Sequence, residues 1–170
     1  PLLHSFPTRR SSDLNDFAVV SHFKDAIVFS FAGSNGEWKD WISNLKLGLF
    51  SSARHEGIFK SFRPFKKRIL ALIKLYPDKK VYVTGHSRGG GLGIICSRFL
   101  AENYITCARI VFGAPKVFGK EYTGKAIRHF TEFYTVINGY DPVPLLPPRT
   151  FGYALSGRMV NFRMPWYYRV

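Results

Sequence analysis

The stretch that decides the fold is Val81–Gly91, which reads VYVTGHSRGGG. It opens with a short apolar run, and the residues after Ser87 begin a predicted helix that ends near Asn103. Between them lies a G-x-S-x-G pattern, in which the serine occupies a strained strand-to-helix turn. Gly85 and Gly89, two residues either side of Ser87, remove side chains that would crowd such a turn. The pattern predicts a nucleophilic serine, although a glycine-rich turn that only packs helix on strand has the same sequence.

Strands alternate with helices on both sides of this turn. The residue patterns predict strands at 17–23, 26–31, 81–84, 110–112, 133–138 and 159–162. They predict helices at 37–47, 57–76, 88–103 and 120–130. Pro64 predicts a kink or a late start in the second of these helices. The alternation indicates an α/β fold, a single domain over residues 15–170 with a mostly parallel central sheet and helices on both faces.

A serine nucleophile needs a base and an acid that orients the base. Asp141 is the best candidate for the acid, because it directly follows the predicted strand 133–138 and so lies at the carboxyl edge of the sheet. Pro142 stiffens the loop around it. An aspartate that only caps a turn before a proline would have the same pattern.

The base is harder to find. In hydrolases with this turn, the chain order is serine, then acid, then histidine. The histidines are His4, His22, His55, His86 and His129, and none of them follows Asp141. His86 adjoins Ser87 but is expected to point elsewhere. Either the base lies outside the chain, or an unusual group replaces it, or the protein is inactive.

The two ends differ in character from the rest of the sequence. Residues 1–14, PLLHSFPTRRSSDL, have no regular hydrophobic period and are similar to a translated sequencing-adapter read. We expect an artefact or a disordered polar tail there. The last residues, MPWYYRV, end on aromatics, which suggests that the domain is truncated at its C-terminus as well. No signal peptide is visible, and localisation is left unassigned.

Composition narrows the class of partner without identifying it. The chain has 25 basic and 11 acidic residues, a net charge of +14, which favours anionic partners such as lipid or nucleic acid. The basic face of 57–76 could meet an anionic membrane or could simply be solvated. No apolar run approaches the ~20 residues of a membrane-spanning helix. Cys96 and Cys107 are expected to be buried thiols.

Six separated segments resemble the class 3 (fungal-type) lipases of the α/β-hydrolase superfamily. The first two, VFSFAGS at 28–34 and DWISNL at 40–45, resemble a strand ending in F-R-G-[ST] and a D-W-x-x-N-L segment. HEGI at 55–58 resembles an H-x-G-F helix start, and 84–89 is the serine turn. FGAPKVFG at 112–119 resembles F-G-x-P-R-V-G, and 138–148 resembles N-x-x-D-P-V-P-x-L-P-P.

The resemblance implies roles for individual residues. Ser87 would be the nucleophile, within the turn formed by Gly85, His86 and Gly89, and Asp141 the triad acid. The backbone N–H groups of Ser34 and Arg88 would form the oxyanion hole. The triad histidine would lie beyond Asp141, in a part that this chain does not contain. Residues 35–44 fall where the family has a lid, so Trp38, Trp41 and Ile42 could face lipid; as an alternative, these side chains are core beneath a short helix.

The function implied is a serine esterase or lipase that hydrolyses acylglycerol esters through an acyl-serine intermediate. No metal or organic cofactor is expected. The partners expected are a lipid or small ester substrate and an anionic membrane or lipid-droplet surface, with no specific nucleic acid. The alternative is a catalytically inactive hydrolase-fold module that binds anionic lipid or nucleic acid. These 170 residues alone are expected to be inactive.

Overall fold

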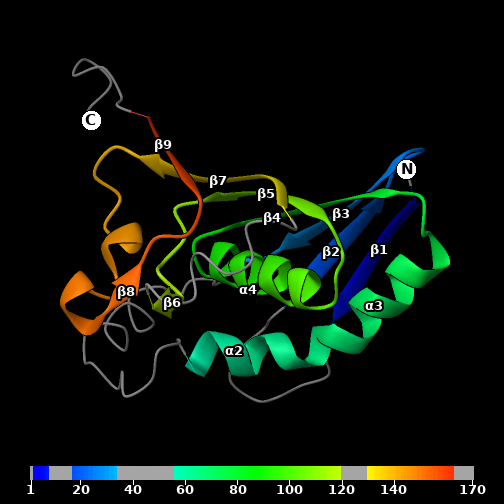
Figure 1. Ribbon diagram of the computed structural model, residues 1–170, viewed down its shortest axis with the longest axis horizontal. Coiled ribbons are helices and arrows are strands. Elements are labelled where there is room, and N and C mark those ends of the chain that lie inside the picture. Colours follow the sequence, from blue (N-terminus) through cyan, green and yellow to red (C-terminus); the bar gives the residue numbers. More distant parts are fainter. Residues whose placement is uncertain (1, 8–16, 34–55, 120–129, 163–170) are drawn as a thin grey trace.

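The computed structural model describes residues 2–7, 17–33, 56–119 and 130–162 (Figure 1). A seven-stranded sheet forms its centre, with strand order β1-β2-β3-β4-β5-β7-β9. The strands are β1 (Leu2–Pro7), β2 (Phe17–His22), β3 (Ala26–Phe31), β4 (Lys80–His86), β5 (Cys107–Phe112), β7 (Phe130–Asn138) and β9 (Arg158–Phe162). From β3 onward every neighbouring pair is parallel, whereas β1 pairs antiparallel with β2 and β2 pairs antiparallel with β3. The mostly parallel central sheet is therefore confirmed.

The described helices lie together on one face of the sheet (Figure 1). They are α2 (Glu56–Phe62), α3 (Lys66–Leu75) and α4 (Arg88–Glu102), with a 3-10 turn at Arg63–Phe65 between the first two. The turn lies at Pro64, so the predicted interruption is confirmed. Helices on both faces are expected from the sequence. On the opposite face, within the described residues, Tyr82, Ile110 and Phe112 are about 40% exposed.

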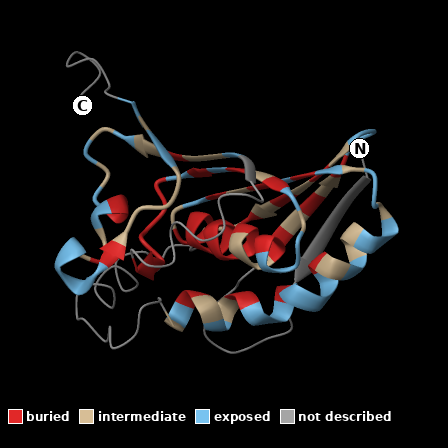
Figure 2. Cartoon of the chain, in the orientation of Figure 1, coloured by how far each residue is buried: buried red, intermediate tan, exposed pale blue. Residues whose placement is uncertain are grey.

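The hydrophobic core lies between the sheet and α4, where Figure 2 shows the buried residues concentrated. In β3 and β4 alternate residues are buried, as expected for strands covered on one face. The first ten residues of α4 are all buried, four of them glycine. Phe31, Phe62 and Phe65 pack edge-on or tilted against one another at centroid distances of 5.5–6.3 Å and close the layer beneath β3. Cys96 and Cys107 are buried free thiols, as predicted.

Several elements differ from expectation. Residues 1–14 were assigned no strand, yet Leu2–Pro7 pairs with β2 along its whole length. Main-chain pairing of this kind needs no hydrophobic period, which is why the sequence did not indicate it. The predicted helices 37–47 and 120–130 fall outside the described residues, except that Phe130 begins β7.

A small second sheet lies near the carboxyl edge of the main one (Figure 1). It pairs β6 (Phe118–Gly119) antiparallel with β8 (Tyr153–Ala154), and two short 3-10 turns, Val143–Leu145 and Arg149–Phe151, precede β8. None of the described helices is long and apolar enough to cross a bilayer.

Candidate active site

Ser87 stands on the sharp turn between β4 and α4. Its backbone has φ 54° and ψ −124°, a conformation that non-glycine residues rarely adopt and that costs about 1–3 kcal/mol. Its N–H donates to the carbonyl oxygen of Phe112 at the end of β5 (2.9 Å). Its carbonyl accepts from the N–H of Gly91 (3.1 Å), and this is the first hydrogen bond of helix α4. The side chain is half-buried. The predicted strained serine turn is confirmed in its backbone geometry.

The two glycines of the pattern are required by backbone contacts. A β-carbon on Gly85 would lie 2.3 Å from the carbonyl oxygen of Gly89. One on Gly89 would lie 2.3 Å from the carbonyl oxygen of Phe31 and 2.6 Å from that of Ala32. The first turn of α4 therefore rests directly on the end of β3. Because Ser87 is the N-cap residue of α4, the positive end of the helix dipole lies next to it.

Arg88 contributes its backbone to this helix start while its side chain points away. The guanidinium is buried and donates to the hydroxyl oxygen of Ser61 on α2 (2.6 Å). It thus ties α4 to α2, a role that the sequence did not indicate. The N–H of Arg88 belongs to the first turn of α4, at the positive end of the helix dipole, which is the kind of position that favours a negative charge.

Asp141 is held at the end of β7 by its own loop. Its N–H donates to the carbonyl oxygen of Asn138 (3.0 Å), and its Oδ1 accepts from the N–H of Val143 (2.9 Å). Its Oδ2 lies 2.5 Å from the point that a β-carbon on Gly113 would occupy. Gly113 has φ +51° and directly follows Phe112, the acceptor of the Ser87 amide. The end of β5 therefore connects the candidate nucleophile with the candidate acid.

Only two histidine side chains belong to the described residues. His22 ends β2 opposite Ile27, at the edge of the sheet away from Ser87, so it cannot reach the site. His86 lies at the site: its Nε2 is 3.5 Å from the same Gly113 point that Asp141 approaches. The side chains of His4, His55 and His129 fall outside the described residues.

The other predicted site residues can be placed only in part. Ser34 and the candidate lid, with Trp38, Trp41 and Ile42, fall outside the described residues. Gly33 is described, and a β-carbon on it would lie 3.1 Å from the carbonyl oxygen of His86 and 3.9 Å from Cβ of Ser87. The chain leading to Ser34 therefore passes directly beside the serine turn.

Lys116 is a buried residue that the sequence analysis did not single out. Its amine donates to the carbonyl oxygens of Leu145 and Pro147, in the loop that follows Asp141. Burial, together with the charge of Arg149, lowers the pKa of Lys116 to about 8. A lone lysine inside the apolar run from Ala114 to Phe118 was the available signal, because such a lysine is seldom solvated.

Neither cysteine competes with Ser87 as a nucleophile. Burial raises the pKa of Cys96 well above its usual value and that of Cys107 to about 12. Both thiols therefore stay protonated at neutral pH, whereas the thiolate is the reactive form.

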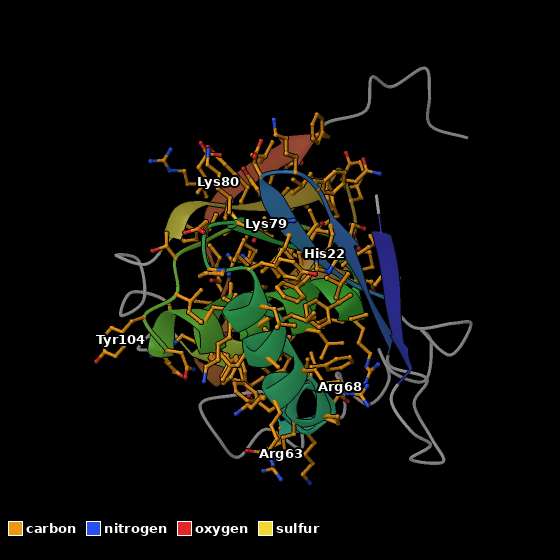
Figure 3. All side chains as sticks on the ribbon, turned by 90° about the vertical axis from the view of Figure 1, so that its right-hand side faces the viewer. His22, Arg63, Arg68, Lys79, Lys80 and Tyr104 are labelled. Atoms are coloured by element: carbon orange, nitrogen blue, oxygen red, sulfur yellow. The ribbon has the colours of Figure 1, made fainter. Side chains whose placement is uncertain are left out.

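A sizeable groove among the described residues lies away from this site. It has a volume of about 1050 Å³ and is lined by the ends of α3 and α4 and the starts of β4 and β5. Figure 3 views the molecule from that end, with Lys79, Lys80 and Tyr104 of its lining labelled. In parallel sheets the chemistry lies at the carboxyl ends of the strands, which is the opposite edge.

Comparison with known proteins identifies the family. The family model described as Lipase (class 3) matches residues 28–151. A secreted mono- and diacylglycerol lipase 1 of Fusarium solani is 26% identical over 147 residues, which cover 81% of this chain and 44% of that protein. The chain thus spans less than half the length of this relative.

Solved structures share the fold. The structure of the Rhizomucor miehei triacylglyceride lipase superimposes with a TM-score of 0.78 at 24% identity, covering 94% of this chain and 66% of that one. A triacylglycerol lipase whose catalytic centre is a serine protease triad superimposes with a TM-score of 0.73 at 24% identity, covering 86% and 62%.

Proposed function

Because this chain belongs to the class 3 lipases of the α/β-hydrolase superfamily, we propose that it is the nucleophile-bearing part of a serine esterase that hydrolyses acylglycerol esters. The observation that carries the proposal is the strained backbone of Ser87, joined through Phe112 and Gly113 to the carboxylate of Asp141. A strained turn of this kind persists only where the surroundings enforce it, and here backbone hydrogen bonds to Phe112 and Gly91 contribute to this.

The mechanism follows from these positions. Ser87 Oγ attacks the acyl carbonyl carbon and gives its proton to a histidine that Asp141 orients. The carbonyl oxygen becomes an oxyanion, which accepts hydrogen bonds from the N–H groups of Arg88 and Ser34. Removal of one such donor costs about 3–4 kcal/mol. The histidine then protonates the leaving alcohol, and water releases the acid from the acyl-serine by the reverse proton transfers.

The base is the part of the mechanism that these residues do not supply. The family resemblance places it after Asp141, and residues 142–170 contain no histidine. We propose that it comes from outside these 170 residues. His86, the one described histidine at the site, directly precedes Ser87 in the turn, and its Nε2 lies 3.5 Å from the point that a β-carbon on Gly113 would occupy.

The substrate class rests on the relatives. The named proteins that this chain resembles act on mono-, di- and triacylglycerols, and we propose the same chemical class here. Residues 35–44, with Trp38, Trp41 and Ile42, would form the lid. The surface contacted would be an anionic membrane or a lipid droplet, because residues 57–77 carry six basic residues and no acidic one.

A second candidate function is a non-catalytic module that binds anionic lipid or nucleic acid. The observation that favours it is the net charge of +14. It retains the fold and the serine turn but forms no acyl-serine.

Ester hydrolysis tests the proposal. The protein, expressed with the coding sequence that follows Val170, is expected to hydrolyse p-nitrophenyl butyrate, and Ser87→Ala is expected to abolish turnover. Ser21→Ala, on β2, serves as the matched control and should keep full activity. Equal turnover by wild type and Ser87→Ala would refute the assignment, and a folded but inactive wild type would favour the binding module.

A further inference from the structure

Lys116 is a buried cation, three residues after Gly113, the glycine that lies against the carboxylate of Asp141. Only 4% of its surface is exposed. Its Nζ donates to the carbonyl oxygen of Leu145 and to that of Pro147 (2.9 Å), and its backbone N–H donates to the carbonyl oxygen of Leu146 (2.8 Å). One residue thus binds three successive carbonyl groups of the loop after Asp141.

The bound loop is continuous with the carboxylate. Asp141 Oδ1 accepts from the N–H of Val143 (2.9 Å). The N–H of Leu145 donates to the carbonyl oxygen of Pro142 (3.1 Å), and that of Leu146 donates to the carbonyl oxygen of Val143 (3.0 Å). These turns link the carboxylate without interruption to the carbonyls that Lys116 holds.

The same short segment supports both ends of this loop. Gly113 lies against Oδ2 of Asp141, and Lys116, three residues later, holds Leu145–Pro147. Residues 113–119 are all buried, so the segment is a fixed base for the loop. The loop is therefore attached before and after the short turn that carries Val143.

A charged residue at this position needs an explanation. Burial of an ammonium group carries a large desolvation cost, and an apolar side chain of similar length would fill the space without it. The cost is offset only if the amine satisfies acceptors that would otherwise be buried without a partner. The carbonyl of Pro147 accepts from the amine in a buried hydrogen bond and that of Leu145 in a partly buried one, so both hydrogen bonds of the amine go to this loop.

We propose that Lys116 is a positioning residue, which holds the carboxylate of Asp141 in its orientation by fixing the Val143–Pro147 loop. The proposal rests on the proposed function in one respect, that Asp141 is the triad acid. The holding of the loop itself is a property of the fold and can be measured without catalysis.

Hydrogen exchange of single amides, followed by NMR, tests it. In Lys116→Met the protection of the Val143 and Leu146 amides is expected to fall about tenfold or more relative to that of Val83 in β4, which reports global stability. Lys116→Arg, which keeps a cationic donor, should retain most of the protection, and Lys116→Gln should be intermediate. Lys80→Met removes an exposed lysine and should leave the Val143 amide unchanged.

The proposal is overturned if the Val143 protection falls no more than that of Val83, or if Lys116→Arg loses as much as Lys116→Met. Should Lys116→Met fail to fold, amide protection in wild type, Lys116→Arg and Lys116→Gln is compared instead. It is expected to fall in that order, and equal protection in all three would overturn the proposal. Ser87 reactivity is measured separately. If Lys116→Met lowers the protection of the loop amides but Ser87 is unreactive, the positioning of the loop is supported and the proposed esterase function is refuted. If Ser87 is reactive but the loop amides keep their protection, only the positioning role is refuted.

Discussion

The N–H of Ser87 donates to the carbonyl oxygen of Phe112, the last residue of the neighbouring strand, at 2.9 Å. The next residue, Gly113, is the one against which Asp141 places its Oδ2. The separation between nucleophile and acid is therefore set by the end of β5, which lies between the strands that carry them. Three parallel strands, rather than the loops alone, determine the geometry of the site.

Substitution of Gly113 by alanine should disturb this arrangement. The added β-carbon would lie 2.5 Å from Oδ2 of Asp141, and the residue has φ +51°. We expect Gly113→Ala to lower ester hydrolysis about 100-fold or more, because displacement of the acid misplaces the base. The measurement is kcat/KM on p-nitrophenyl butyrate, together with the free energy of unfolding.

Gly152→Ala is the matched control for this variant. Gly152 has φ +82°, and a β-carbon on it would meet nothing within 4 Å. Both variants therefore carry a similar backbone cost of about 1 kcal/mol, but only Gly113→Ala collides with Asp141. Equal loss of activity in the two would contradict the proposed contact.

Substitution of Gly89 by alanine should unfold or strongly destabilise the domain. The new methyl would lie 2.3 Å from the carbonyl oxygen of Phe31, so α4 could no longer rest on β3. We expect a loss of about 3 kcal/mol or more in the free energy of unfolding, measured in urea. Gly93→Ala, in the same helix, meets Val111 Cγ1 at 3.1 Å and should cost much less. A similar loss of unfolding free energy in both variants would show that the start of α4 does not pack closely against the end of β3.

The main features of this site could be predicted from local sequence, because each depends on a short pattern. The serine turn follows from glycines two residues either side of Ser87, and Asp141 from its place after a strand. Gly113 and Lys116 could not be predicted in the same way. Their roles depend on contacts with a loop about thirty residues further along the chain, and no local period reports such contacts.

The sheet was predictable to a similar extent. Buried strands such as β4 have a short apolar signal, and Pro64 marks the break between α2 and α3. β1 has no such signal, since its place in the sheet comes from main-chain pairing with β2. The two-residue strands β6 and β8 are too short to have a recognisable period.

Lys116 should make stability depend on pH. Its pKa is about 8 in the folded protein and 10.5 when solvated. Between these values the folded protein has lost the proton and the unfolded chain retains it, so the free energy of unfolding rises with pH. Below pH 8 both states bind the proton and this contribution is constant.

Comparison with Lys116→Met isolates this effect. From pH 8 to 10.5, wild type should gain stability relative to Lys116→Met in urea unfolding, since other titrating groups are common to both. Lys80→Met should follow the pH dependence of wild type. Parallel curves for wild type and Lys116→Met would contradict the lowered pKa.

The basic residues of α2, α3 and the 3-10 turn between them should govern binding to anionic bilayers. Lys60, Arg63 and Lys67 are all exposed. Replacement of these three by glutamate should reduce binding to phosphatidylglycerol vesicles about tenfold or more at low salt, with little binding to phosphatidylcholine in either case. Retained binding in the triple variant, or equally strong binding of an unrelated RNA by wild type, would contradict a lipid-specific role for this face.

Covalent labelling of Ser87 tests the central claim most directly. A fluorophosphonate reacts with an activated serine, so the protein expressed with the coding sequence that follows Val170 is incubated with the probe and the modified peptide is identified by mass spectrometry. We predict a single modification at Ser87, absent from Ser87→Ala and from denatured protein. A folded protein that leaves Ser87 unmodified, or that is labelled equally in Ser87→Ala, would contradict the account.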